Sequence, residues 1–444
     1  MIRSENSTEK PSKSKKVRSK PELILAQKNR LRGMPKESYT LLLEMCRYAN
    51  SLANAAEWHI RHFYEKTGNY LCYEKNYRIS RHNPNYRMLQ ANCAQQTLKR
   101  QDSRHRSYLG LLKAKKNGAY TGDVHPPRYR PKGGYDSLII AGDFIIDRND
   151  GYLVIPISRA FRKLHPGCEI KIRKPTNLAG VRIRQLEILP SRDGSYIEAV
   201  FSYEGTCQDQ KLDKDNALCL DLGIDNFAAG VCSDGTTFLL DGRPLKAINR
   251  YYNKQKAKLQ EELRRRNDKS WSRRLTYISK KRDNRMTDYM RKAARKCVEA
   301  AISHNCGTII VGVNEGWKQN CTMGSAGNQR FCYIPHARFR QMLRTQCAKN
   351  GIDYIEQEES YTSKASALDG DPIPTWTPGS LASPVFSGQR VKRGLYRTRN
   401  GILLNADING ALNIGRKSKQ NDPSLSRIRL CMGELDSPAR IRII

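Results

Sequence analysis

The order of buried strands in the second half of the chain constrains the fold most. Residues 217–242 predict a strand, a turn and a second strand in "ALCLDLGIDNFAAGVCSDGTTFLLDG", where "SDGT" indicates a hairpin. A basic helical region follows at about 244–303, then a strand at 308–313, a helix at about 335–349 and a strand at 352–357. Strands that are paired first by a hairpin and later linked through helices predict an α/β domain with a mixed sheet.

The first half of the chain has a different pattern. Apolar residues recur at helical spacing over 36–67, and a helical stretch rich in Arg, Lys and Gln runs over about 85–116. Prolines and glycines make 124–134, "VHPPRYRPKGG", a loop. Short strands are then predicted at 137–145, 152–157, 168–173, 180–189 and 195–203. We interpret this half as a small β-barrel with a helical block inserted near its start.

Charge limits the partners of the chain. Lys and Arg total 79 against 43 Asp and Glu, a formal net charge of +36 over 444 residues. A compact protein this positive repels itself unless it binds a polyanion, so we expect an extended phosphate-binding surface. The sequence has no apolar run long enough to span a membrane and no secretory signal at its start. We expect a prokaryotic cytoplasmic, nucleoid-associated protein, with a nuclear address in "KSKKVRSK" as the minor alternative.

Two aspartates lie where a carboxylate is costly. Asp221 lies in "CLDLGID", inside the first strand of this domain, and Asp407 lies at a strand-to-helix junction in 404–417, "LNADINGALNIGRK". A charge in such a strand costs several kcal/mol unless it is paired or binds a metal. We expect the two to meet across neighbouring strands, where carboxylates could hold two Mg²⁺ or Mn²⁺ ions for phosphodiester hydrolysis. The alternative is a structural aspartate in a turn.

Four segments together resemble one known family. "LDLGID", "YTSKAS", "RGLYRTRNG" and "NADINGALNIGRK" are similar, in that order, to TnpB, the insertion-sequence OrfB proteins related to type V CRISPR effectors. The resemblance is dense over 216–417. It implies an RNase H-like (RuvC) nuclease domain and an N-terminal wedge β-barrel interrupted by a helical recognition lobe. It also implies Asp221 and Asp407 as metal ligands, a guide RNA, and a double-stranded DNA target with a short flanking motif.

The resemblance divides the chain into seven segments. They are a basic arm and the start of the barrel (1–35), the recognition lobe (36–123), the wedge barrel (124–215), the nuclease domain (216–359), a degenerate target-nucleic-acid-binding insert (360–400), the last nuclease segment (401–417) and a polar, mobile tail (418–444).

The chain departs from the family at two points. Members usually carry paired Cys-x-x-Cys motifs after "YTS", whereas residues 360–400 offer Ser366 and Asp369 and contain no Cys or His. None of the 13 cysteines of the chain forms a Cys-x-x-Cys pair, so we expect reduced thiols and no bound zinc. The family glutamate usually ends the strand equivalent to "TIIVGV", where this chain has Gly312.

Three glutamates are candidates for the missing carboxylate. Glu358 and Glu359 end the strand "IDYIEQ", and Glu315 follows "TIIVGV" in a turn. A crossover through helix 335–349 would make the two strands parallel neighbours, and open α/β sheets bind ligands at the C-terminal ends of such strands. We expect Glu359 to complete a rearranged site with Asp221 and Asp407, with Glu358 and then Glu315 as alternates.

Basic residues near these motifs are the expected nucleic-acid contacts: Arg128, Arg130, Lys132, Lys364, Arg390 and Arg393. Asn409 and Asn413 would support Asp407 or contact nucleic acid, and capping with local hydrogen bonding is the alternative.

The sequence therefore predicts a Mg²⁺- or Mn²⁺-dependent, RNA-guided DNA endonuclease encoded by a transposable element. Loss of a carboxylate leaves open a catalytically inactive, RNA-guided DNA-binding repressor. A transposase or transposase accessory protein is the third alternative. The pattern leaves the oligomeric state open.

Overall fold

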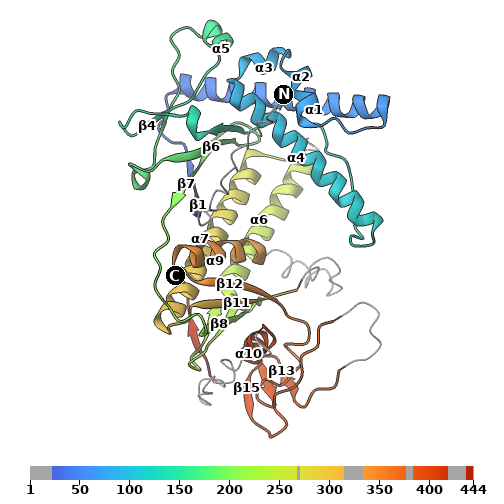
Figure 1. Ribbon diagram of the computed structural model, residues 1–444, viewed down its shortest axis with the longest axis vertical. Helices are drawn as coiled ribbons and strands as arrows, with labels where there is room; N and C mark the ends of the chain where they lie inside the picture. The colour runs from blue at the N-terminus through green and yellow to red at the C-terminus, as the bar shows by residue number, and fades with distance from the viewer. Residues whose placement is uncertain (1–22, 268–270, 315–333, 377–383, 419–436, 444) are drawn as a thin grey trace, which may run out of the picture. The chain divides into compact units, whose positions relative to one another are not determined.

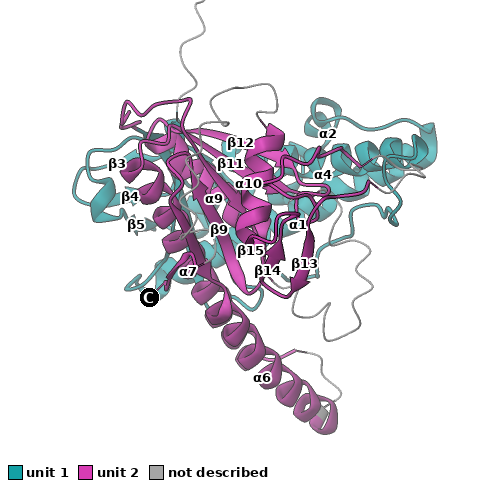
Figure 2. Cartoon of the chain, turned by 90° about the horizontal axis from the view of Figure 1, so that it is seen from below, with its two compact units in different colours: residues 1–205 teal, residues 206–444 magenta. Residues whose placement is uncertain are grey.

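The computed structural model describes residues 23–267, 271–314, 334–376, 384–418 and 437–443. The chain forms two compact units, residues 1–205 and 206–444, each of which we describe by itself (Figure 2). No helix within these described ranges is long and apolar enough to cross a membrane.

Unit 1 begins with a strand and a helical block (Figure 1). Its helices are α1 (Lys36–Thr67), α2 (Tyr73–Ser80), α3 (Pro84–Met88), α4 (Ala91–Lys116) and α5 (Arg159–Leu164), with short 3₁₀ turns at Gly142–Phe144 and Thr176–Leu178. On α1, buried Leu42, Met45, Ala49 and Leu52 recur every three or four residues and form one stripe. Gly68 ends the helix in the left-handed conformation (φ +67°), which a glycine adopts without strain.

The strands of unit 1 pair as two antiparallel sheets. One has the order β1-β7-β6-β2 and the other β3-β4-β5. The strands are β1 (Leu23–Arg30), β2 (Leu138–Ala141), β3 (Ile146–Asp147), β4 (Tyr152–Val154), β5 (Lys171–Arg173), β6 (Ile183–Pro190) and β7 (Ile197–Gly205). One hydrophobic core joins the helices to both sheets, through residues such as Leu42, Leu98, Ile140, Leu153 and Phe201. The closed wedge barrel and its recognition lobe stay a prediction.

Unit 2 contains a six-stranded mixed sheet in the order β12-β11-β8-β9-β10-β16. Its members are β8 (Ala217–Asp221), β9 (Asn226–Cys232), β10 (Thr237–Asp241), β11 (Thr308–Val313), β12 (Asp353–Glu358) and β16 (Ala439–Ile441). The β8–β9–β10 part is an antiparallel meander, whereas β11 runs parallel to both β8 and β12. A meander whose first strand lies beside two helix-linked parallel strands makes this a mixed α/β sheet, as the sequence predicted.

Helices cover both faces of this sheet. The helices of unit 2 are α6 (Arg243–Asn267), α7 (Arg273–Ser303), α9 (His336–Lys349) and α10 (Ala406–Ser418). Leu218 and Leu220 of β8 share a core with residues of α7 and α9. Ala217 and Cys219 instead contact Ile414 of α10, which lies on the opposite face (Figure 2). Because successive strand residues point to opposite faces, the next odd-numbered position, Asp221, points to the face that α10 covers.

The unit boundary lies between Gly205 and Thr206, whereas the sequence placed it at 215/216. Residues 206–215 hydrogen-bond to the rest of unit 2: Gln208 N–H donates to the Lys349 carbonyl at 2.7 Å, and Gly307 N–H donates to the Asp213 carbonyl at 2.7 Å. These bonds hold residues 206–215 against the sheet and helices of unit 2, which explains why unit 2 begins at Thr206.

Two segments are more ordered than the sequence predicted. The insert at 360–400 contains β13 (Gln389–Lys392) and β14 (Leu395–Arg397), which pair with β15 (Leu403–Asn405) as a small antiparallel sheet. The expected mobile tail (418–444) includes β16, which pairs with the edge strand β10. The prediction of a mobile tail is wrong for these residues, because the open edge of β10 supplies backbone partners that the polar tail sequence does not reveal.

Candidate functional site

Asp407 is held at the start of α10 by its own local sequence. The Asn405 side-chain oxygen accepts hydrogen bonds from the Asp407 N–H at 3.0 Å and the Ile408 N–H at 3.3 Å, as an N-cap does. The Asp407 carboxylate therefore lies in the first turn, where the helix dipole stabilises negative charge.

Asp407 approaches Asp221 from a helix, which the sequence did not predict. The two were expected on neighbouring strands, but β15 belongs to the small sheet, and Asp407 lies on α10. The helix crosses the end of β8 closely: a Cβ at Gly410 would lie 2.5 Å from Asp221 Oδ2. The expectation of neighbouring strands is therefore wrong, and Gly410 permits the close approach that replaces it.

Glu358 and Glu359 have different surroundings. Glu358 accepts a hydrogen bond from Lys417 Nζ at 2.5 Å and others from Ser360. Although burial acts to raise the pKa of Glu358, these hydrogen bonds hold it below its ordinary value. Lys417 is buried, so Glu358 serves as its counter-ion. The structure therefore places Glu358 in a structural ion pair.

Glu359 lies on the other side of the same turn, beside Gly312. A Cβ at Gly312 would lie 2.6 Å from Glu359 Oε2. Gly312 pairs with Gln357 across β11 and β12, and the Glu359 N–H donates to the Val313 carbonyl at 3.2 Å. The Glu359 carboxylate thus occupies space beside the position where the TnpB resemblance expects a glutamate. Glu315, the third candidate, lies outside the described residues.

The three carboxylates interact electrostatically. Burial raises the pKa of Asp221 well above its ordinary value, and the charges of Glu359 and Asp407 raise it further. Burial, followed by the charge of Glu358, raises the pKa of Glu359 to about 7. Among the described residues, no set of one oxygen from each of the three carboxylates has all its members within 4.8 Å of one another.

The donor set fits a hard divalent cation. Asp221, Glu359 and Asp407 supply oxygen ligands, which Mg²⁺ and Mn²⁺ prefer. Asn226 Nδ2 donates to Asp407 Oδ2 at 2.6 Å, while the buried Asn226 Oδ1 has no hydrogen-bond partner among the described residues. A water bound to a cation at this site would supply the missing donor.

A basic cavity of about 430 Å³ opens beside Asp407. Arg390 lies 3.8 Å from the Asp407 carboxylate, whereas Arg393 and Lys246 both pair with Asp225. All of these residues line the cavity. Arg390 and Arg393 are therefore close to the carboxylates, where they can contact a phosphate group.

The buried side chains of Asn409 and Asn413 fix the turn that follows Glu359. Asn409 Nδ2 donates to the Ala365 carbonyl at 2.8 Å, and Asn413 Nδ2 donates to the Thr362 and Ala365 carbonyls at 2.8 and 2.7 Å. Both side chains are fully buried, so neither contacts nucleic acid. Of the alternatives raised from the sequence, the structure favours support of the site through local hydrogen bonds.

Hydrogen bonds connect the two parts of the insert that lie before and after 377–383. Asp369 Oδ2 accepts from Ser366 Oγ at 2.6 Å, Ser387 Oγ at 3.0 Å and Arg399 N–H at 2.9 Å. Asp371 Oδ2 accepts from the Ser366 and Ser387 N–H groups at 2.8 and 3.0 Å. These contacts join 366–371 to Ser387 and Arg399.

We expect Asp369→Ala to destabilise this segment by roughly 2 kcal/mol, because it removes three hydrogen bonds to a charged acceptor. Hydrogen exchange at the amides of Ser366 and Arg399 should accelerate accordingly. The control Asp288→Ala removes an exposed partner of Lys292 on α7 and should leave these amides unchanged. Equal exchange in wild type and Asp369→Ala would contradict this role.

Of the four other predicted contacts, three belong to unit 1 and one, Lys364, belongs to unit 2. Arg128 and Lys132 are exposed on the loop of unit 1, and Lys364 is exposed on the turn after Glu359. Arg130 is largely buried and pairs with Asp136 at 2.9 Å, which makes it a structural residue of the loop.

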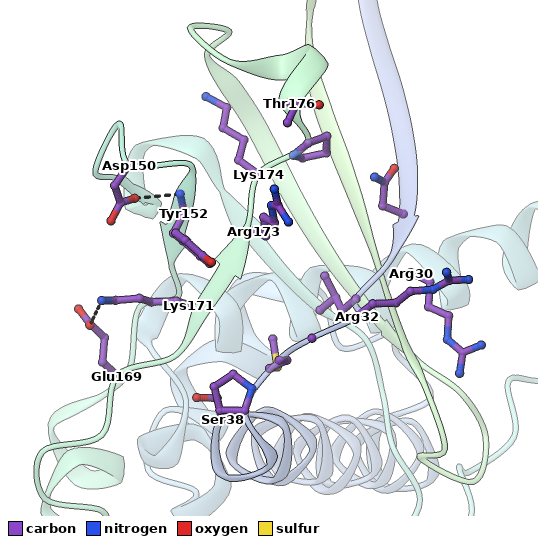
Figure 3. Close-up of a pocket in the computed structure, with 16 residues that line it drawn as sticks. Arg30, Arg32, Ser38, Asp150, Tyr152, Glu169, Lys171, Arg173, Lys174 and Thr176 are labelled. Atoms are coloured by element: carbon purple, nitrogen blue, oxygen red, sulfur yellow. Dashed lines mark hydrogen bonds and ion pairs between the residues drawn. The ribbon is translucent and has the colours of Figure 1, made fainter.

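Unit 1 has a larger basic cavity, of about 870 Å³, that the sequence analysis missed (Figure 3). Its lining includes five cations: Arg30, Arg32, Lys171, Arg173 and Lys174. Lys171 pairs with Glu169 and Lys174 with Asp147. Arg32 and Arg173 are exposed, and no described carboxylate pairs with either. Alternating cations in "KIRK" at 171–174 were the only signal in the sequence, and that signal does not reveal Arg32 as a neighbour.

The fold and its carboxylates define an α/β domain with a mixed sheet, and comparisons with known proteins agree with this class. Residues 200–318 match the family model of the OrfB_IS605 probable transposase, and residues 336–414 match that of the Cas12f1-like TNB domain. These matches confirm the resemblance to TnpB. No curated protein matches the sequence.

One solved structure shares the fold. The chain resembles the protein in a cryo-EM structure of a Cas12f1–sgRNA–target DNA complex, with 13% identity, a TM-score of 0.53, and coverage of 85% of this chain and 81% of that chain. It also matches the mini-RNA-guided endonuclease CRISPR-Cas_phi3, with 10% identity, a TM-score of 0.41, and coverage of 89% and 92%. The first match shows a mixed α/β fold in common with a Cas12 effector.

Proposed function

We propose that this protein is an RNA-guided DNA endonuclease encoded by a transposable element. The observation that carries the proposal is the position of Glu359 Oε2, 2.6 Å from where a Cβ at Gly312 would lie. Glu359, which follows the neighbouring strand β12, would thereby supply the carboxylate that β11 lacks at Gly312. Glu359 lies close enough to raise the pKa of Asp221. An inactive relative would have no need of this replacement.

In this proposal Asp221, Glu359 and Asp407 hold Mg²⁺ or Mn²⁺. The bound ions would activate water and stabilise the leaving oxygen of a phosphodiester. Asn226 orients the Asp407 carboxylate through its 2.6 Å hydrogen bond. Arg390 and Arg393 bind the phosphate that faces the carboxylates.

The proposed partners are a guide RNA and a double-stranded DNA target with a short flanking motif. The net charge of +36 and the family matches support nucleic acid as partner. Base pairing would supply the sequence specificity, while the protein reads the backbone and the flanking motif. Unit 1 would supply the wedge barrel and recognition lobe. The protein would act in the cytoplasm of a prokaryote, on the nucleoid.

Sequencing the RNA that co-purifies with the protein tests the partner. We expect one abundant RNA with a constant part and a part that matches a DNA target. A heterogeneous pool of cellular RNA, in proportion to its abundance, would contradict guidance.

We expect the unit 1 cavity to bind the guide RNA. The double variant Arg32→Gln/Arg173→Gln should lower the affinity for the co-purified RNA roughly tenfold and make the logarithmic salt dependence shallower by about 2, because two phosphate contacts are lost. Binding is measured between about 50 and 200 mM salt.

The matched control Arg265→Gln/Arg295→Gln also removes two charges, from ion pairs with Glu261 and Glu299 on α6 and α7. It should bind with nearly wild-type affinity. An equal loss in both double variants would mean that only the overall charge matters, and the cavity would have no special role.

Two alternatives make different products. A catalytically inactive repressor would bind guided DNA without Mg²⁺-dependent cutting. A transposase or accessory protein would join strands as well as cut them, and analysis of the DNA ends separates that outcome from cleavage alone.

A further inference from the structure

Two short segments of unit 2 bring together side chains that the proposed function does not use. The first is Cys232-Ser233-Asp234 in the turn between β9 and β10, and the second is His304-Asn305-Cys306 between α7 and β11. Each segment offers two metal-binding residue types that are two positions apart. Paired ligands from two separate segments are the usual arrangement of structural zinc sites.

The β9–β10 turn fixes the first pair. Cys232 N–H donates to the Thr236 carbonyl at 2.9 Å, and Gly235 N–H donates to the Cys232 carbonyl at 2.9 Å. Gly235 has φ +93°, which the tight turn requires. Asp234 Oδ1 accepts from Thr236 N–H at 2.9 Å, so its second oxygen, Oδ2, remains for another partner.

The end of α7 fixes the second pair. His304 N–H and Cys306 N–H donate to the Ala300 and Ala301 carbonyls at 3.1 and 2.7 Å, and Asn305 between them has φ +50°. This bend directs His304 and Cys306 to the hairpin. His304 Nδ1 lies 2.7 Å from Asp234 Oδ2.

Three of the four side chains converge, and Cys306 lies next to them. One potential ligand atom each from Cys232, Asp234 and His304 lies within 4.8 Å of the others. The Cys306 thiol donates to the His304 carbonyl at 3.4 Å, and the Cys232 and Cys306 thiols are close enough for each to shift the pKa of the other. Both cysteines are fully buried, whereas the Asp234 and His304 side chains are 46% and 31% exposed. The sulfurs of Cys232 and Cys306 thus face inward, and the side chains of Asp234 and His304 lie between them and solvent.

We propose that Cys232, Asp234, His304 and Cys306 bind one zinc ion. Two thiolates, an imidazole and a carboxylate suit tetrahedral Zn²⁺ better than Mg²⁺, which prefers oxygen ligands. Around a zinc ion with bonds of about 2.0–2.3 Å, ligand atoms lie about 3.3–3.8 Å apart. The exposed Asp234 and His304 side chains can separate from 2.7 Å to that spacing with small rotations.

The site is structural rather than catalytic. Cys232 pairs with Leu218 at the start of β8, whereas Asp221, at its other end, pairs with Ala229. Three residues of strand separate the two ends by about 10 Å. A zinc ion here would join the β9–β10 turn to the end of α7 and the start of β11, and so hold the sheet that carries Asp221.

This proposal differs from the sequence-based expectation that the chain binds no zinc. That expectation rested on residues 360–400, which contain no Cys or His, and on the absence of Cys-x-x-Cys pairs. Here the ligands are spaced as Cys-x-Asp and His-x-Cys, and folding brings together segments about 70 residues apart in the chain.

The test is the zinc content of the full-length protein, purified with its RNA under reducing conditions and then dialysed against Zn²⁺. Wild type should hold about one zinc ion per chain, and His304→Gln and Cys306→Ser should each hold almost none. His304→Gln changes a partly exposed side chain, so its fold survives even if Cys306→Ser disturbs the core. The control Cys207→Ser removes an exposed cysteine and should retain the zinc. Chelation should lower the Tm of wild type and Cys207→Ser, and leave that of His304→Gln unchanged.

Three results would overturn the proposal. One is wild-type protein without zinc after dialysis. Another is zinc that persists in both His304→Gln and Cys306→Ser and disappears only when Cys321, Cys332 or Cys431 is replaced. The third is a wild-type mass two hydrogens lighter with a Cys232–Cys306 peptide cross-link, which would show that the two thiols form a disulfide instead.

Discussion

We expect Asp221→Ala and Asp407→Ala each to reduce Mg²⁺-dependent DNA cutting by at least about 10³-fold, because a metal ligand contributes several kcal/mol of transition-state stabilisation. Guide RNA binding should stay nearly unchanged, since phosphate contacts of the RNA come from Lys and Arg rather than from these carboxylates. The measurement is single-turnover cleavage of a labelled duplex, with RNA affinity determined on the same preparations.

The control is Asp353→Ala at the opposite end of the sheet. Asp353 begins β12, is 63% exposed and pairs with Lys214, so its loss should change neither cutting nor RNA binding. Cutting at a near-wild-type rate in Asp221→Ala or Asp407→Ala would contradict the two-aspartate assignment.

Thermal stability separates a catalytic defect from a folding defect. Burial and the neighbouring carboxylates raise the pKa of Asp221, so its ionised form destabilises the metal-free chain near neutral pH. Asp221→Asn should therefore inactivate the protein and at the same time raise its Tm in the absence of metal. A lowered Tm would indicate that Asp221 is needed for folding.

The second large expected effect is a difference in cleavage between variants of Glu359 and Glu358. Glu359→Gln should lower guided cleavage about 10²–10³-fold, because it removes one ligand charge from the site. Glu358→Gln should cut at nearly the wild-type rate but unfold more easily, by on the order of 1 kcal/mol, because it weakens the ion pair with buried Lys417. Cleavage rates and unfolding of both variants are measured side by side.

Gly312 allows a sharper version of this test. Gly312→Ala should impair cutting, because the added methyl group would press against Ile414 Cδ1 and lie 2.6 Å from Glu359 Oε2. Gly312→Glu combined with Glu359→Gly returns the carboxylate to the neighbouring strand and should recover part of the activity lost in Glu359→Gly alone. If Glu315→Gln alone abolishes cutting while Glu358→Gln and Glu359→Gln cut normally, the Glu359 assignment is wrong.

Local sequence predicted the strands and helices of unit 2 in their order along the chain, because their apolar runs and turn residues are local patterns. It could not predict that Asp407 reaches Asp221 from α10, since that depends on how closely a helix with glycine at 410 crosses β8. The pairing of β16 with β10, the hydrogen bonds of Asp369, and the cluster at Cys232 and His304 all join segments far apart in the chain. No single pattern along the sequence encodes such contacts.

The most direct test of the proposed function is guided cleavage. The purified protein with its co-purified RNA is incubated with DNA duplexes that carry the matching sequence, with and without Mg²⁺, beside a duplex of scrambled sequence. A library of flanking sequences next to the match identifies the required motif. We predict cutting of the matched duplex alone, only with Mg²⁺ or Mn²⁺, and none by Glu359→Gln on the same timescale. Specific binding of the matched duplex without cutting under any of these conditions would contradict the proposed nuclease and favour the inactive repressor.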